Sequence, residues 1–289
     1  MQVGAVFPQN EIGTDPGGVR AYAEAVESIG YRHILAYDHV LGADPAVHAG
    51  WSGPYDVHSD FHEIMVLLGY LAGVCSLELA TGIVILPQRQ TVLVAKQASA
   101  VDVLTGGRLR LGVGLGWNPV EYEALGENFH DRGRRVEEQI ELMRLLWTEE
   151  SVSYEGRWHK LTGAGLSPMP VQRPIPLWFG GGGSERALER IGRLGDGWMP
   201  QHRPGEELDR ALGVVRAAAR QAGRDPGALG VEGRIEGGHK DVDRIAHHAR
   251  KWSEAGASHL SVSTMYAGLE SVDGHIEALR RTAEAVGLD

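Results

Sequence analysis

The sequence has little of what would place a protein in a membrane or an oxidising compartment. Cys75 is the only cysteine, so no disulfide can form within the chain. No apolar run approaches the ~18 residues that a membrane-spanning helix needs. The opening residues, MQVGAVFPQN, read as a strand rather than as a basic and apolar secretion signal. We therefore expect a cytoplasmic protein that does not associate with membranes.

An excess of positive charge is also missing. The formal net charge is −10, whereas nonspecific binding to nucleic acid or to anionic lipid needs a basic face. Hydrophobic residues make up 43% of the chain and charged residues 23%, which is typical of a globular protein with an ample core. We expect small molecules as partners and no nucleic acid.

A dinucleotide-binding fingerprint is absent as well, although the stretch GRLRLGVGLGW (107–117) is rich in glycine. In the G-x-G-x-x-G pattern, Gly112 and Gly114 require a third glycine at position 117, which is Trp117. Gly114 and Gly116 require one at position 119, which is Pro119. These glycines therefore need another explanation.

What the sequence does contain is an alternation of short apolar runs and longer segments with helical spacing. The apolar runs span residues 2–7, 33–38, 77–86, 108–115, 175–181, 197–201, 229–235 and 259–265. Eight such rounds predict a parallel sheet that closes into a (β/α)8 TIM barrel, with residues 1–289 as a single domain. An open doubly wound sheet is the alternative, but it would need a phosphate fingerprint after its first strand.

Two connections are too long for plain loops, and long ordered loops are usually functional. Residues 40–60 follow the second strand, and residues 150–174 follow the fourth strand and its helix. The second connection contains SVSYEGRWHKL, which predicts a small hairpin turning at Glu155 and Gly156. We expect a barrel with insertions after strands 2 and 4.

The fifth strand ends in four glycines, Gly180, Gly181, Gly182 and Gly183, followed by Ser184 and a helix. Free amides at a helix N-terminus attract phosphate. A tight turn capped by Ser184 is the alternative, although such a turn needs only one or two glycines. The run of four favours a phosphate site.

Other candidate residues lie where predicted strands end. Asp38 and His39 close the second strand, and a histidine there can exchange a proton near neutral pH. His58 and His62 have the spacing of two metal ligands on a helix, but no third ligand is evident, so no metal site is predicted. Gly82, inside a buried strand, indicates a bulge or a backbone pressed against a ligand.

Several stretches together resemble a known family. They are YDHV after the second strand, ATGIVILPQRQTVLVAKQ around the third, GGRLRLGVGLGW, ALGENFHDRGRRVEEQIELMRLLWTEE, VSYEGRWH and RPIPLWFGGGGSERALERIGRLGDGW. On these residues the chain resembles the luciferase-like monooxygenase superfamily, barrel enzymes that use flavin or the deazaflavin coenzyme F420. Within this superfamily, the short chain most resembles the F420-dependent oxidoreductases.

The resemblance implies specific roles for the residues around the third strand. Members support the cofactor ring on a bulge with a non-prolyl cis peptide, which here falls between Gly82 and Ile83, with Ile83 backing the ring. Asp38 and His39 match the family pair near the ring and the reacting carbon. His39 is then the expected acid–base group, with Asp38 orienting it or touching the ring.

The resemblance also assigns roles beyond the fourth and fifth strands. The four glycines and Ser184 match the cofactor's phosphate site. Gly112, Gly114 and Gly116 would let strand 4 run close beneath the cofactor, with Asn118 as a polar contact. Basic neighbours for an acidic cofactor tail are expected among four residues, chosen by sequence position only: Arg89, Lys96, Arg186 and Arg203.

One position departs from the family pattern. Several F420-dependent dehydrogenases have a glutamate proton donor just after strand 4, where this chain has Trp117, here a candidate aromatic contact of the cofactor. The proton could then come from His39 or from another residue such as Glu121, or the reaction could need none.

Three functions are compatible with these expectations. The first is hydride transfer between F420 and an organic substrate. The second is an FMN-dependent monooxygenase that receives reduced flavin from a partner reductase, and the third is a carrier without activity. Relatives with this fold are commonly dimers, so we expect a homodimer by analogy.

Overall fold

The computed structural model describes residues 1–238 and 241–288. Its parallel strands close into a ring with the order β3-β2-β1-β11-β10-β9-β8-β5-β4, and β3 also pairs with β5. The strands are β1 (Gln2–Val6), β2 (His33–Ala36), β3 (Glu78–Thr81), β4 (Val84–Ile85), β5 (Leu109–Gly114), β8 (Leu177–Gly181), β9 (Gly197–Pro200), β10 (Gly230–Glu236) and β11 (His259–Ser263). Because β3 and β4 share one place in the ring, the barrel has eight positions, and the predicted (β/α)8 TIM barrel is confirmed.

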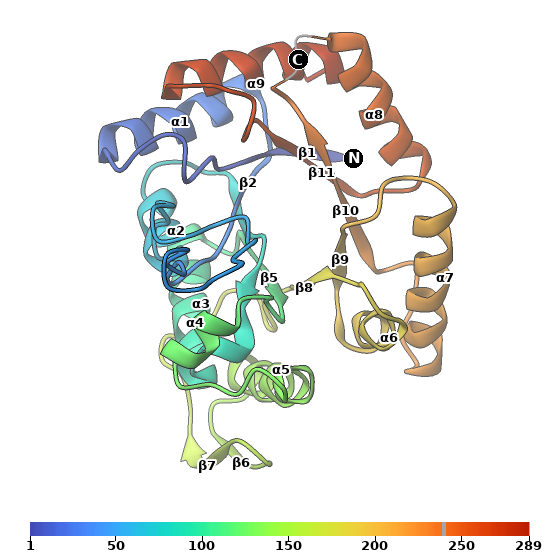
Figure 1. Ribbon diagram of the computed structural model, residues 1–289. Helices are drawn as coiled ribbons and strands as arrows, with labels where there is room; N and C mark the ends of the chain where they lie inside the picture. Colours follow the sequence, from blue (N-terminus) through green and yellow to red (C-terminus); the bar gives the residue numbers. More distant parts are fainter. Residues whose placement is uncertain (239–240, 289) are drawn as a thin grey trace.

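Helices surround this ring (Figure 1). They are α1 (Pro16–Ile29), α2 (Ile64–Ala72), α3 (Thr91–Thr105), α4 (Pro119–Ala124), α5 (Arg132–Thr148), α6 (Glu185–Leu194), α7 (Glu206–Gln221), α8 (Val242–Glu254) and α9 (Val272–Val286), with a short 3-10 helix at Leu86–Gln88. α1 illustrates how the sequence sets their ends. Asp15 caps its first turn, Pro16 begins it, and Gly30 ends it with a φ of 104°.

The third barrel position is broken in the middle, where the sequence predicts one strand over residues 77–86. Ala80 pairs with Arg110 and Val84 with Val113, so the broken strand carries one residue more than β5 between these pairs. That extra residue is a β-bulge. A cis peptide joins Gly82 to Ile83 at this point, as the resemblance implies. We call residues 82–83 the strand break.

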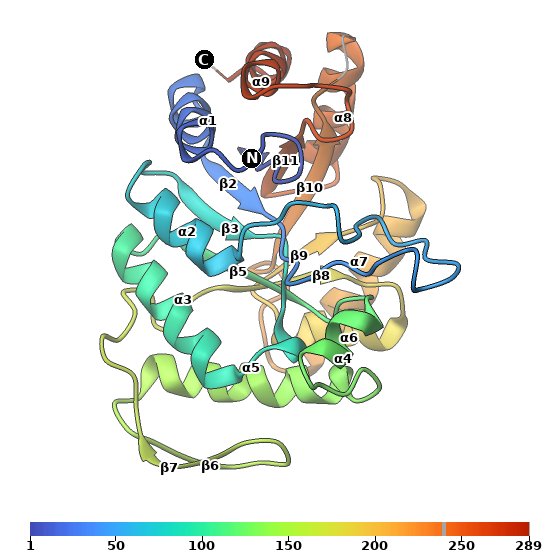
Figure 2. The same cartoon turned by 60° about the vertical axis from the view of Figure 1, so that its left-hand side comes forward.

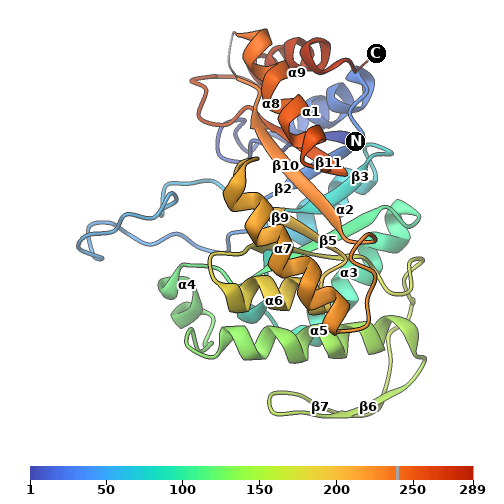
Figure 3. The same cartoon turned by 90° about the vertical axis from the view of Figure 1, so that its right-hand side faces the viewer.

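The two long connections lie outside the barrel wall. The connection between β2 and α2, which we call the 40–63 loop, extends beyond the carboxyl ends of the strands (Figures 2 and 3). β6 (Val152–Glu155) and β7 (Lys160–Ala164) form the predicted antiparallel hairpin, which lies outside α5. Both predicted insertions are therefore confirmed.

A charged layer fills the barrel interior, where apolar side chains usually pack. Arg110 forms ion pairs with Glu78 and Glu232, and His33 Nε2 lies 2.9 Å from Glu232 Oε1. Burial would raise the pKa of Glu232, but Arg110 and His33 hold it well below its ordinary value. Glu232 is therefore a permanent anion beneath the barrel mouth.

Within the described ranges, no helix combines the length and apolar character needed to cross a membrane.

Candidate active site

Two adjoining cavities open at the carboxyl ends of the strands. The larger has a volume of about 1080 Å³ and the smaller about 440 Å³. Gly82, Ile83, Gly116 and Trp117 line both. The strand break therefore lies at the junction of the two cavities, in the place where barrel enzymes carry their reactive groups.

Glycines from β5 and β8 make room for the strand break. A Cβ atom on Gly180 would lie 2.7 Å from Ile83 Cγ2, and one on Gly114 would lie 2.8 Å from Ile83 Cγ1. A Cβ on Gly112 would overlap the Thr81 carbonyl oxygen. The space beside Gly112 and Gly114 is thus filled by the chain's own third strand. Gly114 and Gly116 also line the smaller cavity, so the expected approach of this strand to the cofactor stays a prediction.

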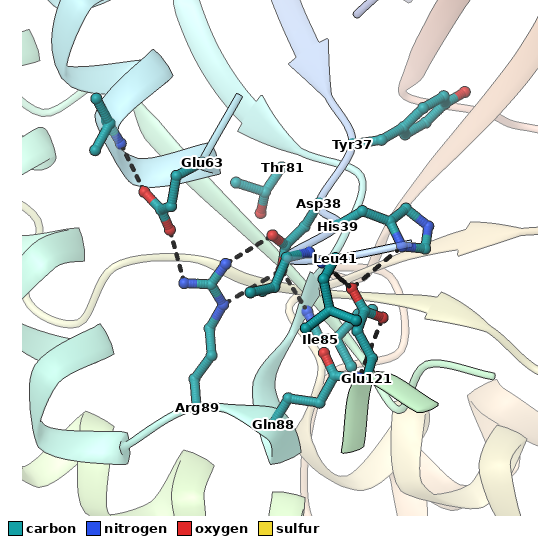
Figure 4. A network of polar contacts seen from close by, with 12 residues as sticks. Tyr37, Asp38, His39, Leu41, Glu63, Thr81, Ile85, Gln88, Arg89 and Glu121 are labelled. Atoms are coloured by element: carbon teal, nitrogen blue, oxygen red, sulfur yellow. Dashed lines mark hydrogen bonds and ion pairs between the residues drawn. The ribbon is translucent and has the colours of Figure 1, made fainter. Parts of the chain in front are cut away.

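Asp38 stabilises the strand break from the side of β2. Its Oδ2 accepts a hydrogen bond of 3.1 Å from Ile85 N, and its Oδ1 lies 2.7 Å from Arg89 Nη2 (Figure 4). Arg89 also pairs with Glu63, which caps α2, at 2.7 Å. Burial would lower the pKa of Arg89, but Asp38 and Glu63 raise it above its ordinary value. Asp38 therefore ties β2 to the broken strand, and its hydrogen-bond partners among the described residues are Ile85 and Arg89 and not His39. Because Asp38 also lines the larger cavity, its expected contact with the ring stays a prediction.

The carboxylate beside His39 belongs to Glu121 on α4. His39 Nδ1 lies 3.3 Å from Glu121 Oε1, and the same oxygen accepts from Val40 N at 2.7 Å (Figure 4). Glu121 is completely buried. Burial would raise its pKa, but hydrogen bonds from His39 and Val40 lower it below the ordinary value. An ionised Glu121 can only accept, so the hydrogen lies on His39 Nδ1 and Nε2 remains for a ligand.

Aromatic rings enclose His39 at the edge of the larger cavity. The ring centroids of Tyr55 and Phe61, both in the 40–63 loop, lie 4.7 Å and 4.9 Å from that of His39. Trp117 lies 5.8 Å from His39 and 5.6 Å from Trp51. Trp117 therefore joins the end of β5 to the loop and brings no acidic group to the cavity.

The glycine run after β8 lines the smaller cavity together with Ser184. Gly181 and Gly182 have φ values of 100° and 117°, a conformation that glycine adopts readily. Ser184 caps α6 by accepting from Ala187 N at 3.3 Å. Within residues 1–238 and 241–288, the amides of residues 182–184 donate to no protein acceptor. The turn interpretation and the phosphate interpretation are therefore compatible.

Other predicted site residues lie elsewhere. Asn118 Oδ1 accepts from Val120 N at 3.0 Å and Glu121 N at 3.4 Å, and the buried side chain lines neither cavity. It is the N-cap of α4 instead of a residue facing the cavities, and the Asn-Pro pair that begins this helix is the sequence signal for that role. His58 and His62 precede α2 and are not on a helix.

The four basic residues expected near an acidic cofactor tail lie in different places. Arg203 lines the larger cavity. Arg89 is engaged by two carboxylates, Lys96 donates to the Ser167 carbonyl, and Arg186 lies exposed on α6 and lines neither of the two cavities. Of the four, only Arg203 faces the cavities without a carboxylate partner among the described residues.

Sequence analysis missed the basic residues that line the smaller cavity: Arg132, Arg190 and Arg234. They come from α5, α6 and β10, and no local pattern connects them. Arg132 lines the same cavity as the glycine run, and its guanidinium lies 3.7 Å from the Phe129 ring centroid and donates from Nη1 to the Phe129 carbonyl at 2.6 Å. The positive charge of Arg132 would attract an anion bound by the glycine run.

Comparison with known proteins agrees with this geometry. The chain is 30% identical over 254 residues to the F420-dependent hydroxymycolic acid dehydrogenase of Mycobacterium tuberculosis, covering 86% of this chain and 66% of that protein. It is 35% identical over 130 residues to the FMNH2-dependent dimethylsulfone monooxygenase of Pseudomonas putida, covering 44% and 36%. An F420-dependent secondary alcohol dehydrogenase has the same fold, with a TM-score of 0.79, 18% identity and coverage of 99% and 98%.

These relatives include both F420-dependent and FMNH2-dependent enzymes. The family model for luciferase-like monooxygenases matches residues 2–280, which is nearly the whole chain. The strand break, the two cavities and the glycine run all lie within this range. The chain therefore belongs to the luciferase-like monooxygenase family.

Proposed function

We propose that this protein transfers hydride between F420 and a small organic substrate, with His39 as the acid–base group. The observation that carries the proposal is the strand break. Ile83 is half-buried at the junction of two cavities, and His39 lines the larger of them. A flat ring seated on Ile83 would leave its other face open to a substrate beside His39.

The residues present fit an F420-sized ligand. The joined cavities provide a half-buried apolar support at Ile83 and a donor-rich end at residues 182–184 and Arg132. These amides and the Arg132 guanidinium would hold the phosphate and the acidic tail. When bound, F420 supplies a carbon that accepts or donates hydride.

The chain's own part in the reaction is to hold and move a proton. His39 Nδ1 donates to Glu121, so Nε2 can accept a proton from a substrate hydroxyl or return one. Glu121 lies behind His39 and does not line the cavities. Trp117 has no titratable group. We therefore assign the proton to His39 Nε2, with Glu121 as the residue that positions its ring.

F420 is preferred over FMN because the F420-dependent relative matches 86% of the chain and the FMNH2-dependent one 44%. We expect fluorescence titration to give at least tenfold tighter binding of F420 than of FMN. Tighter FMN binding, with oxygen consumed when a reductase is added, would contradict the F420 assignment. Binding of F420 without hydride transfer across a broad panel of alcohols and ketones would favour the carrier.

We also propose that the protein is a homodimer, through α2 and α3. Val66 on α2 is 71% exposed, and Leu104 on α3 is 64% exposed. Leu93 on α3 is also exposed, at 52%, and exposed apolar side chains gathered on adjacent helices usually mark contacts with another protein.

Sedimentation should give twice the chain mass of 31.3 kDa, and L104E should shift the protein to monomer. V242E is the matched control, because Val242 is 45% exposed on α8, away from α2 and α3 (Figure 1). A wild-type monomer, or dissociation caused by V242E alone, would contradict this interface.

A further inference from the structure

The larger cavity continues beyond the strand break toward β10 and β11. We call this part the tyrosine compartment. Its walls are Tyr37, Tyr55, Arg234, Ile235, Met265 and Tyr266. Tyr37 follows β2, Tyr55 comes from the 40–63 loop, and Tyr266 follows β11. Three separate segments thus bring phenol groups around one guanidinium.

Arg234 makes few contacts for an arginine at a cavity. Its Nη1 donates to the Tyr37 hydroxyl at 3.1 Å. Over residues 1–238 and 241–288, no carboxylate lies within ion-pair distance of it, whereas Arg89 pairs with Asp38 at 2.7 Å and Arg190 with Glu137 at 2.8 Å. Glu236 lines the same cavity and acts on Arg234 through its charge. Arg234 therefore holds a positive charge whose remaining N–H donors face the cavity.

The phenols add further donors. Burial raises the pKa of Tyr37 more than Arg234 lowers it, and burial also raises the pKa of Tyr55. Both phenols are therefore protonated near neutral pH. Because the Tyr37 oxygen accepts from Arg234, its own proton is directed to another acceptor. Tyr266 lines the same cavity as Tyr55 and contributes to raising the pKa of Tyr55.

We infer that the tyrosine compartment binds a carboxylate of the substrate, so that the substrate class is an organic acid. A carboxylate accepts two parallel hydrogen bonds from a guanidinium and a further one from a phenol. Ile235 and Met265 offer apolar contacts to the adjoining carbon skeleton. The reacting carbon would then lie between this compartment and His39. This inference rests on the proposed function.

A rival occupant is an acidic group of the cofactor, because Arg234 also lines the smaller cavity. That cavity already offers the amides of residues 182–184 and the Arg132 guanidinium to anions. The larger cavity offers Arg234 and Arg203. Substituting Arg234 and Arg203 one at a time shows whether Arg234 binds the substrate carboxylate or an acidic group of the cofactor.

The test is a titration of the F420-bound protein with matched acids and amides: benzoate and benzamide, cinnamate and cinnamamide. Change in tryptophan fluorescence reports binding. We expect the better acid to bind at least tenfold more tightly than its amide. R234Q should abolish this preference, Y37F should reduce it, and R203Q should retain it, since Arg203 is a matched cation of the same cavity.

Three results would overturn the inference. The first is that the wild-type protein binds the acid no more tightly than the amide, or does not bind the acid. The second is that R234Q still prefers the acid over the amide. The third is that R203Q loses this preference as fully as R234Q does. A tenfold loss of F420 affinity in R234Q with an unchanged acid preference would assign Arg234 to the cofactor. The acid and amide titration is also repeated without cofactor, so that it can be read even if no cofactor binds. Failure of both F420 and FMN to bind, with the acid preference still present, would contradict the proposed function alone.

Discussion

Replacing Glu121 by glutamine is expected to lower the turnover number about 10- to 100-fold while leaving F420 affinity within about twofold, the size of effect typical when a supporting partner of a reactive histidine is changed. Glutamine keeps one oxygen for Val40 N but removes the negative charge beside His39 Nδ1. Without that charge, the His39 ring can adopt the opposite tautomer.

The fold should survive E121Q. Gln88 Nε2 donates to Glu121 Oε2 at 3.3 Å, and the buried Gln88 Oε1 has no partner in the described structure. Rotation of the Gln88 amide would present this oxygen to the new amide group, so the hydrogen bond between the two side chains is kept. Loss of turnover in E121Q would therefore report on chemistry and not on unfolding.

Two measurements check this prediction. The rate of hydride transfer in a single turnover, with any substrate that the panel identifies, gives the kinetic effect. The ¹⁵N chemical shifts of His39 give its tautomer, which should change from Nδ1-protonated in the wild type to a mixture in E121Q. E123Q is the matched control, because Glu123 lies exposed on the same helix. An unchanged rate and tautomer in E121Q would remove Glu121 from the site.

The second large effect is expected from G114A. The new Cβ would lie 2.8 Å from Ile83 Cγ1 and even closer to Cδ1, so the Ile83 side chain must move into the cavity. Overpacking of this kind costs about 1–3 kcal/mol of stability. We expect the affinity for F420 to fall at least tenfold as well, because Ile83 would then occupy the place of the ring.

A second substitution tests the cause. I83V removes Cδ1, so the double variant G114A/I83V should regain most of the affinity lost in G114A, which reveals a direct interaction between the two sites. G213A is the control. Gly213 lies within α7, and its Cβ would meet nothing within 4 Å, so this variant should be about 0.5–1 kcal/mol more stable. An unchanged F420 affinity in G114A, beside a lowered melting temperature, would mean that Ile83 does not support the ring.

The barrel could be predicted from sequence because each strand is a local apolar run. The runs at 2–7 and 175–181 contain β1 and β8, since buried parallel strands are largely apolar along their length. The strand break was also predictable, because Gly82 inside such a run indicates a bulge. Its role as the neighbour of Gly114 and Gly180 was not, since register across the sheet decides which residues meet.

The site was harder to predict because its partners are distant in sequence. Asp38 and His39 are adjacent, yet one pairs with Arg89 and the other with Glu121. A backbone that turns at the end of β2 sends successive side chains in different directions, so adjacency misled the assignment of Asp38. Asn118 was misread for a different reason, because a capping side chain and a ligand contact both require a polar residue at a helix start.

A crystal structure of the protein with F420 bound is the most direct test of the central claim. We predict that the ring packs on Ile83 at the strand break, with His39 Nε2 facing the substrate side, and that the phosphate contacts the amides of residues 182–184 and Arg132. A ring bound away from Gly82 and Ile83, or a phosphate held by other residues than these, would contradict the account.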